Sequence, residues 1–284
     1  VSPPKVTENA YIAGNLNADT SKSQVVQAQS SFTTATGGLA RVDTDLASLG
    51  QSNGLVDNDE IEFELIDNQG NPIGPITFTY VSTITDATFD ATTGSGSTLG
   101  HMVEVLNDQL GASGSVTLVD GLLVFRDAQI GNSQFEVTNV AMGAGAIGNI
   151  SFPGFGITQE GETGSKTVSS TIYDSLGRAH TLILEFTQID VNTWDYQARF
   201  LDGETIVSGA GPGQPGYTGP LQFNDQGQLT SNSLTNIEFD PGNGAGNVVF
   251  NVSLGDPTAG VSFTQYSGTS TAKAISQDGY AQGQ

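Results

Sequence analysis

Residues 181–200, TLILEFTQIDVNTWDYQARF, contain two runs in which apolar and polar residues alternate. The apolar positions are Leu182, Leu184 and Phe186 in the first run, and Trp194, Tyr196, Ala198 and Phe200 in the second. Such alternation places one set of side chains on each face of a β-strand. The stretch therefore predicts two neighbouring strands, each with one face buried in a core.

The same alternation recurs on both sides of this stretch, with turn residues between the runs. It is clearest at residues 59–65, 76–80, 166–172 and 248–254. Asp120-Gly121 separates two apolar runs, which is a strong hairpin signal because both residues tolerate a positive φ. Asp202-Gly203 marks a further turn. Many short strands joined by turns predict a mainly β chain, folded as an antiparallel β-barrel or sandwich.

One helix is predicted, over residues 98–110. Leu99, Met102, Leu106 and Leu110 recur at three- and four-residue spacing, which places them on one helical face. Thr98 is suited to cap the start of this helix, and Gly111 to end it.

The composition excludes several classes of function. Thirty Asp and Glu residues face eight Lys and Arg residues, which gives a formal net charge of −22. This charge repels nucleic acids and anionic membrane surfaces. The chain has no cysteine, so it has neither disulfides nor thiolate metal sites. No apolar segment reaches the length of a membrane-spanning helix.

A search for reactive or ligating residues predicts no catalytic residue, no cofactor and no metal site. His101 and His180 lie in different blocks without further ligands, so we expect a surface or packing role for both. Residues 57–60 (DNDE) and 67–71 (DNQGN) resemble calcium loops but lack the full ligand series, and turn formation explains them better. Residues 143–148 (GAGAIG) contain the spacing GxGxxG without the flanking strand and helix of a nucleotide site.

Three stretches together resemble the flagellar hook protein family. They are residues 14–18 (GNLNA), residues 171–182 (TIYDSLGRAHTL) with the following tryptophan strand, and residues 277–283 (QDGYAQG). The resemblance rests on Asn15, Leu16, Asn17, Tyr173, Asp174, Ser175, Gly177, His180, Trp194, Gln277, Asp278, Gly279 and Tyr280. The order and spacing of the stretches are those of the family, and residues 223–229 (FNDQGQL) fit between them. The resemblance implies structural rather than catalytic roles for all these residues.

The family resemblance also implies a function. The chain is identified as the exposed middle part of a hook protein, without the terminal segments that form the inner tube in the family. Hook subunits polymerise with themselves into a short curved tube, the universal joint that transmits motor torque to the filament. The implied partners are copies of the chain and the rod, hook-cap and hook–filament junction proteins. The implied location is the extracellular hook, reached through the flagellar secretion apparatus.

We expect two domains, one inserted in the other. Residues 1–33 and 154–284 would form a proximal β-barrel, and residues 34–153 an inserted outer β-rich domain that carries the helix. Two other classes of protein stay open from the sequence. One is a hook-associated or filament-type protein or a secreted adhesin of similar β domains. The other is a carbohydrate-active enzyme, which would need two close carboxylates in a cleft.

Overall fold

The computed structural model describes residues 2–230, 234, 236–256 and 258–283, and its chain divides into two compact units. Unit 1 comprises residues 1–21 and 163–284, and unit 2 comprises residues 22–162. The sequence pattern predicts the division at 33/34 and 153/154. The structure instead assigns residues 22–33 and 154–162 to the inserted unit.

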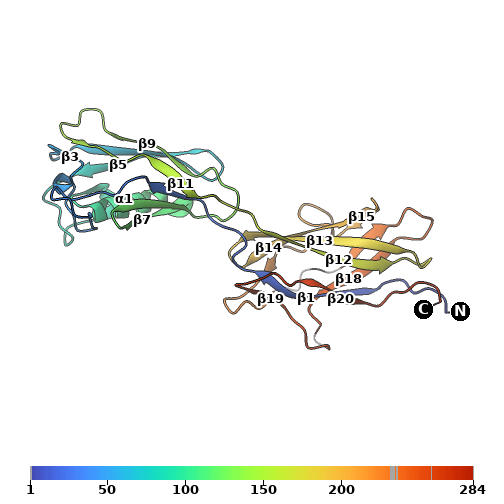
Figure 1. Cartoon of the computed structure of the whole chain (residues 1–284). Coiled ribbons are helices and arrows are strands. Elements are labelled where there is room, and N and C mark those ends of the chain that lie inside the picture. Colours follow the sequence, from blue (N-terminus) through green and yellow to red (C-terminus); the bar gives the residue numbers. More distant parts are fainter. Residues whose placement is uncertain (1, 231–233, 235, 257, 284) are drawn as a thin grey trace. The chain divides into compact units, whose positions relative to one another are not determined.

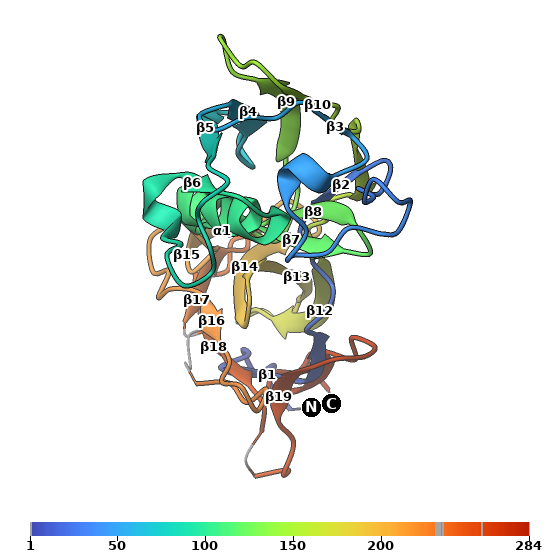
Figure 2. The same ribbon diagram turned by 90° about the vertical axis from the view of Figure 1, so that its left-hand side faces the viewer.

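Unit 1 consists of two sheets. Its strands are β1 (Asn9–Asn17), β12 (Ser165–Tyr173), β13 (Ala179–Asp190), β14 (Thr193–Phe200), β15 (Thr205–Ser208), β16 (Leu221–Gln222), β17 (Ile237–Asp240), β18 (Val248–Leu254), β19 (Phe263–Tyr266) and β20 (Lys273–Gln277). One sheet has the order β12-β13-β14-β16, and the other has the order β15-β17-β18-β1-β19 with β20 also paired to β1. In Figure 2, β12, β13 and β14 curve along one side of this unit, and β1, β18 and β19 lie opposite them.

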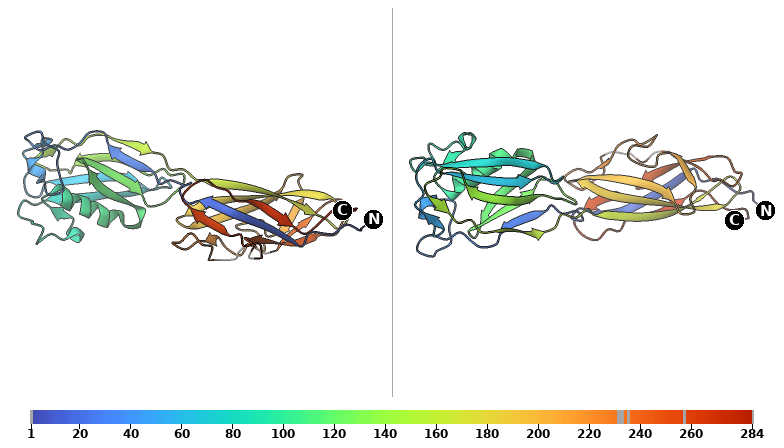
Figure 3. Two further views of the ribbon diagram at one scale, coloured as in Figure 1. Left: turned by 60° about the horizontal axis from the view of Figure 1, so that its bottom comes forward. Right: turned by 90° about the horizontal axis from the view of Figure 1, so that it is seen from above.

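The pairing of strand β1 differs from the antiparallel arrangement that the sequence predicts for unit 1. It pairs in parallel with β18 and with β19, and antiparallel with β20. Figure 3 shows this blue strand between red strands from the other end of the chain. Parallel pairing over so long a sequence separation leaves no local signal, because no turn joins the partners. The two termini consequently lie side by side (Figure 1), and Lys5 pairs with Tyr280.

The core of unit 1 is aromatic and lies between the two sheets. The apolar residues of the 181–200 stretch are buried in it as predicted, with Trp194 fully enclosed. The Phe200 and Phe239 rings pack with their centroids 4.0 Å apart, and Phe186 contacts Phe263 from the opposite sheet. Large aromatic side chains contribute much of the buried apolar area in such a core.

Unit 2 contains two four-stranded sheets and the helix. Its elements are β2 (Val25–Ala28), η1 (Leu46–Ser48), β3 (Ser52–Asn53), β4 (Glu60–Ile66), β5 (Pro72–Tyr80), η2 (Ala91–Thr93), β6 (Ser95–Gly96), α1 (Leu99–Leu110), η3 (Gly111–Ser113), β7 (Gly114–Val119), β8 (Leu122–Asp127), β9 (Glu136–Met142), β10 (Asn149–Ile150) and β11 (Phe155–Gln159). The sheets have the orders β11-β2-β8-β7 and β6-β5-β4-β9, and β10 pairs with β3. Helix α1 packs on β7 and β5.

Strands β2 and β11 explain why the division between the units differs from the prediction. β2 pairs with β8 on one side and with β11 on the other. Val26 and Phe32 are buried in the core of unit 2, and Phe155 packs against that core. These segments are short and weakly patterned, so their membership is determined by pairing partners that are remote in sequence.

The strongest local predictions in unit 2 are confirmed. Helix α1 begins after Thr98, whose hydroxyl accepts from the His101 amide, and ends at Gly111. The Asp120-Gly121 turn joins β7 to β8, with φ of 49° and 77° at its two residues. β4 buries Ile61, Phe63 and Leu65 on one face, as the alternation predicts. No helix in the described part of the chain is long and apolar enough to span a membrane.

Candidate functional site

Asp174 organises the turn between β12 and β13 and is fully buried. Its Oδ1 accepts from the backbone amides of Leu176 and Arg178, both at 2.9 Å. Its Oδ2 accepts from Asn243 Nδ2 at 2.6 Å and lies 3.1 Å from His180 Nε2. One carboxylate thus holds the turn closed and joins it to the loop that follows β17.

His180 lies between two carboxylates. Its Nε2 faces Asp174, and its Nδ1 lies 2.6 Å from Glu204 Oε1. A ring nitrogen that carries a proton can donate to the carboxylate that it faces. The ring also packs edge-on against Phe239, with centroids 5.3 Å apart. Of the two roles predicted for His180, packing is the one observed, since the side chain is buried.

Hydrogen bonds keep both carboxyl groups around His180 acidic. Burial raises the pKa of Asp174, but donors from Asn243, Arg178, His180 and Leu176 outweigh burial and lower this pKa below its ordinary value. Burial likewise raises the pKa of Glu204, and the bond from His180 contributes most to the net lowering. Asp174 and Glu204 are therefore ionised at neutral pH while they are hydrogen-bonded within the Asp174–His180–Glu204 cluster.

A second cluster joins the first residues of unit 1 to the last. Asp278 Oδ1 accepts from the backbone amides of Glu8 and Asn9, each at 2.9 Å. Its Oδ2 lies 3.1 Å from Lys5 Nζ. Gln277 Oε1 accepts from the Thr7 hydroxyl at 3.0 Å. This cluster ties the strand entering unit 1 to the strand leaving it.

The remaining terminal motif residues take part in the same joining of the two chain ends. Thr7 Oγ1 accepts from the Tyr173 amide, and the Thr7 amide donates to the Tyr173 carbonyl. A Cβ on Gly279 would lie 2.2 Å from Thr7 Oγ1, so the chain approaches too closely there for another residue. Tyr280 and Lys5 exchange backbone hydrogen bonds.

Asn15, Leu16 and Asn17 lie where β1 runs beside β19. Asn15 Oδ1 accepts from the Tyr266 amide at 2.7 Å, and its Nδ2 donates to the Tyr266 carbonyl. Leu16 is buried in the core. Asn17 Oδ1 accepts from the Gly268 amide. The two asparagines thus extend the pairing of β1 beyond its backbone ladder.

Trp194 and the 174–177 turn complete the predicted set. Trp194 Nε1 donates to Gln265 Oε1 at 2.6 Å, and Gln265 Nε2 donates to Asn192 Oδ1. Gly177 has φ of 77°, and a Cβ there would lie 2.7 Å from Pro4. Ser175 is exposed at the turn. The predicted motif residues therefore gather at several separate clusters in unit 1 and do not converge on one site.

A pocket of about 480 Å³ lies over the His180 cluster. It is lined by residues 178–180, 202–205 and 240–243, so three turns contribute to it. Both nitrogens of His180 are engaged with carboxylates, so the ring does not activate a nucleophile. No group of three potential metal ligands is found among the residues that the structure describes.

The residues that resemble calcium, nucleotide or metal sites in the sequence stabilise turns and loops of unit 2. Asp59 accepts from the amides of Ile147 and Gly148, so the glycine-rich loop 143–148 wraps a carboxylate of its own unit. Asp67 Oδ1 accepts from the amides of Gln69 and Asn71 within its turn. His101 stacks on Phe89 and lies 3.1 Å from Asp86.

Several residues of these clusters carry no signal in the sequence. Glu204, Asn243 and Gln265 each bond a motif residue, yet none belongs to a motif. Glu204 follows the predicted Asp202-Gly203 turn, which is the one hint that it lies near the end of a strand.

Comparison with protein families finds a similarity for the second half of the chain. Residues 147–280 match the family described as the flagellar basal body protein FlaE D2 domain. This part of the chain is similar to a flagellar hook D2 domain. This match confirms the resemblance that the sequence motifs indicate, and the matched D2 region contains the Asp174–His180–Glu204 cluster, Trp194 and Asp278.

The chain was also compared with curated proteins and with solved structures. No curated protein matches the chain. Among solved structures, the flagellar hook protein FlgE2 of Helicobacter pylori is similar at 12% identity and a TM-score of 0.36. The alignment covers 98% of this chain and 60% of that one, so the chain spans about 60% of the length of that hook protein.

Proposed function

We propose that the chain is the exposed part of a subunit of the bacterial flagellar hook, and that copies of it form a curved, flexible tube. The observation that carries this proposal is the D2 domain at residues 147–280. The hydrogen bonds around Asp278 support it, since they join residues 5–9 to residues 277–278 near the two ends of the chain, where the inner segments of a hook subunit would connect.

The tube transmits torque from the motor to the filament while it bends. Bending requires neighbouring copies to slide, so contacts between their outer surfaces are polar and wet rather than fused apolar seams. Unit 2 would be an outer module that adds such surface. The subunit is exported through the flagellar secretion apparatus and meets the rod, the hook cap and the hook–filament junction proteins.

The subunit acts by shape and has no catalytic role. The polar clusters of unit 1 stabilise its fold. The Asp174–His180–Glu204 cluster joins three turns, and each of its ring and carboxylate contacts is accounted for by that joining, apart from one oxygen of Glu204.

Immunogold electron microscopy of intact flagella tests the proposal. Antibodies raised against this chain are expected to label the short curved segment at the base of the flagellum. Labelling along the filament would favour a filament-type protein. Labelling of the cell surface away from flagella would favour an adhesin, and either pattern would contradict the proposal.

A further inference from the structure

Strand β1 lies inside its sheet, but its partners come from the other end of the chain. β18 and β19 pair with it in parallel, and β20 pairs with it in the antiparallel direction. Among the described residues, every strand that pairs with β1 begins at or after Val248. The Asp278 carboxylate also accepts from the Asn9 amide across 269 residues of sequence. The strand therefore stays unpaired until the last part of the chain has taken its place.

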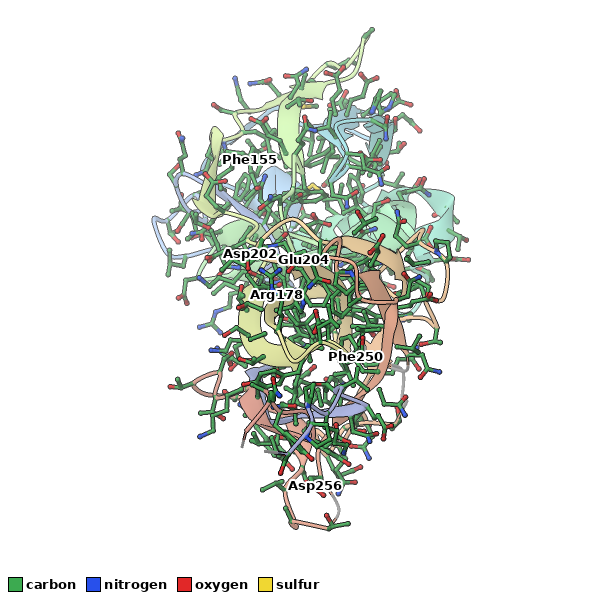
Figure 4. The ribbon with its side chains drawn as sticks, turned by 90° about the vertical axis from the view of Figure 1, so that its right-hand side faces the viewer. Phe155, Arg178, Asp202, Glu204, Phe250 and Asp256 are labelled. Atoms are coloured by element: carbon green, nitrogen blue, oxygen red, sulfur yellow. The ribbon has the colours of Figure 1, made fainter. Side chains whose placement is uncertain are left out.

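β1 also completes the core of unit 1. Its Ile12 and Leu16 side chains are fully buried, and Ala10 is buried beside them. Phe250 and Val252, the ladder partner of Ala10, belong to β18 and are buried in the same core (Figure 4). Without β1 this apolar surface would face water, so the insertion of β1 is the step that closes the core.

The other strands of unit 1 are joined more locally. β12, β13 and β14 are consecutive in the chain and pair with one another, and β17 pairs with β18, the strand that follows it. Contacts between segments that are close in sequence form faster than contacts that close a long loop. These strands can therefore pair before β1 does.

Unit 2 consists of one continuous segment whose two ends are held together. Lys22 and Glu162 exchange backbone hydrogen bonds of 2.8 and 3.0 Å, and their side chains form an ion pair at 2.8 Å. In the unfolded chain these two residues are 140 residues apart. Folding of unit 2 thus removes a long flexible loop, and the entropic cost of joining two segments falls as the loop between them shortens.

We propose that β1 is the closing strand of unit 1, and that it inserts after unit 2 has folded. The joined ends of unit 2 bring residues 21 and 163 of unit 1 close together, and the Ser21 hydroxyl then accepts from the Gly164 amide at 2.8 Å. β1 enters last, between β18 and β20. The inference does not depend on the proposed function. It implies that the hydrogen bonds around Asp278, which join the two ends of the chain, form only in a complete chain.

Refolding of the full chain, followed by pulsed hydrogen exchange and NMR, tests the order of these steps. The Asp127 amide is hydrogen-bonded within unit 2, and the Leu201 amide donates to the Thr181 carbonyl of β13. The Gly255 amide donates to the Ile12 carbonyl at 2.7 Å and reports on β1. Asp127 and Leu201 are expected to gain protection before Gly255. Protection of Gly255 at the same time as Asp127, or before it, would overturn the proposal.

Phe125→Asp tests whether folding of unit 2 assists the closure. Phe125 is fully buried in the core of unit 2, so a carboxylate there is expected to unfold this unit, with loss of Asp127 protection. Protection of Gly255 is then expected to become slower by roughly tenfold or more, because the long loop is restored. Val119→Asp adds the same charge at an exposed position of unit 2 and is expected to leave the rate unchanged. An unchanged rate in Phe125→Asp would contradict the proposed order.

A disulfide separates the joining of the ends from the folding of unit 2. The chain has no cysteine, so Lys22→Cys and Glu162→Cys, at directly paired positions, create a single defined disulfide. In the Phe125→Asp chain, the oxidised form is expected to recover a rate of Gly255 protection close to that of wild type, and the reduced form to stay slow. Equally slow protection in both forms would overturn the proposal. These measurements use the dissolved chain, so their failure is distinguishable from a failure of the immunogold experiment.

Discussion

At the scale of single residues, buried or half-buried polar side chains hold segments of unit 1 together. Asp174, Asp278 and Asn15 each accept from backbone amides that lie in other segments or across a turn. Hydrogen bonds to a carboxylate are worth more than neutral ones, and a removed acceptor leaves its buried donors unpaired. These motif residues therefore stabilise the contacts between segments of unit 1.

Asp278→Asn is expected to destabilise unit 1 in a pH-dependent way. Burial raises the pKa of Asp278, but the amides of Asn9 and Glu8 and the Lys5 ammonium lower it to about 2. Because the folded pKa is depressed, the stabilisation is complete above the ordinary pKa of 3.8 and is lost as the pH falls through about 2. This corresponds to about 2 kcal/mol at neutral pH.

Urea unfolding of wild type and variant at neutral pH and near pH 2 measures this effect. Asp225→Asn, an exposed change in the same unit, serves as the control and is expected to have little effect. A difference between wild type and Asp278→Asn that stayed constant down to the lowest pH would show that the carboxylate charge contributes nothing.

The sequence predicted the position of many residues but few of their polar partners. Alternation identified the buried faces of β4, β13 and β14, because burial follows a period of two. The partners within this cluster were not predictable from the sequence. Glu204 lies 24 residues from His180, and Asn243 lies 69 residues from Asp174. Such contacts depend on which turns meet at one end of the fold. The local pattern of residues does not show which turns meet.

At the scale of elements, the sequence predicted correctly those features that depend on interactions within a few residues. The Asp120-Gly121 hairpin and the capped helix α1 formed as predicted. The parallel pairing of β1 and the membership of β2 and β11 were not predicted. These features are decided by strands that are distant in sequence, so composition and periodicity alone do not determine them.

Gly164→Ala is expected to destabilise unit 1 at the start of β12. A Cβ at Gly164 would lie 1.8 Å from Thr20 Cγ2 and 2.7 Å from the Thr20 carbonyl carbon. The Gly164 amide also donates to Ser21 Oγ at 2.8 Å, which holds the backbone in place. Overpacking of this kind costs about 1–3 kcal/mol.

Gly246→Ala is the matched control for this substitution. A Cβ at Gly246 meets no atom within 4 Å, so the free energy of unfolding should change by less than about 0.5 kcal/mol. The two variants are compared by denaturant unfolding. Equal stability of both variants would contradict the close approach of Gly164 to Thr20.

At the scale of the whole molecule, the insertion of unit 2 into unit 1 predicts independent folding of unit 1. Replacing residues 22–162 by a short Gly-Ser linker is expected to leave unit 1 with a cooperative thermal transition. The reason is that Ser21 and Gly164 are already held together within unit 1 by a hydrogen bond. Calorimetry of the deletion variant measures the transition, and a non-cooperative melt would refute the nested arrangement.

The charge of the molecule predicts how assembled copies respond to salt. Copies of charge −22 repel one another over about one Debye length, roughly 8 Å at physiological ionic strength. Raising the salt concentration, or adding divalent cations, is expected to favour closer packing of the outer surfaces. Electron microscopy of isolated hooks at several ionic strengths measures their curvature. Unchanged curvature would mean that the charge serves solubility alone.

Helical reconstruction of isolated hooks by electron cryo-microscopy tests whether this chain is a hook subunit. We expect density for unit 1 in every subunit, with both chain ends entering an inner layer and polar contacts between the outer surfaces of neighbouring copies. Hooks whose subunit density does not fit this D2 fold, or copies joined by continuous apolar seams, would contradict it.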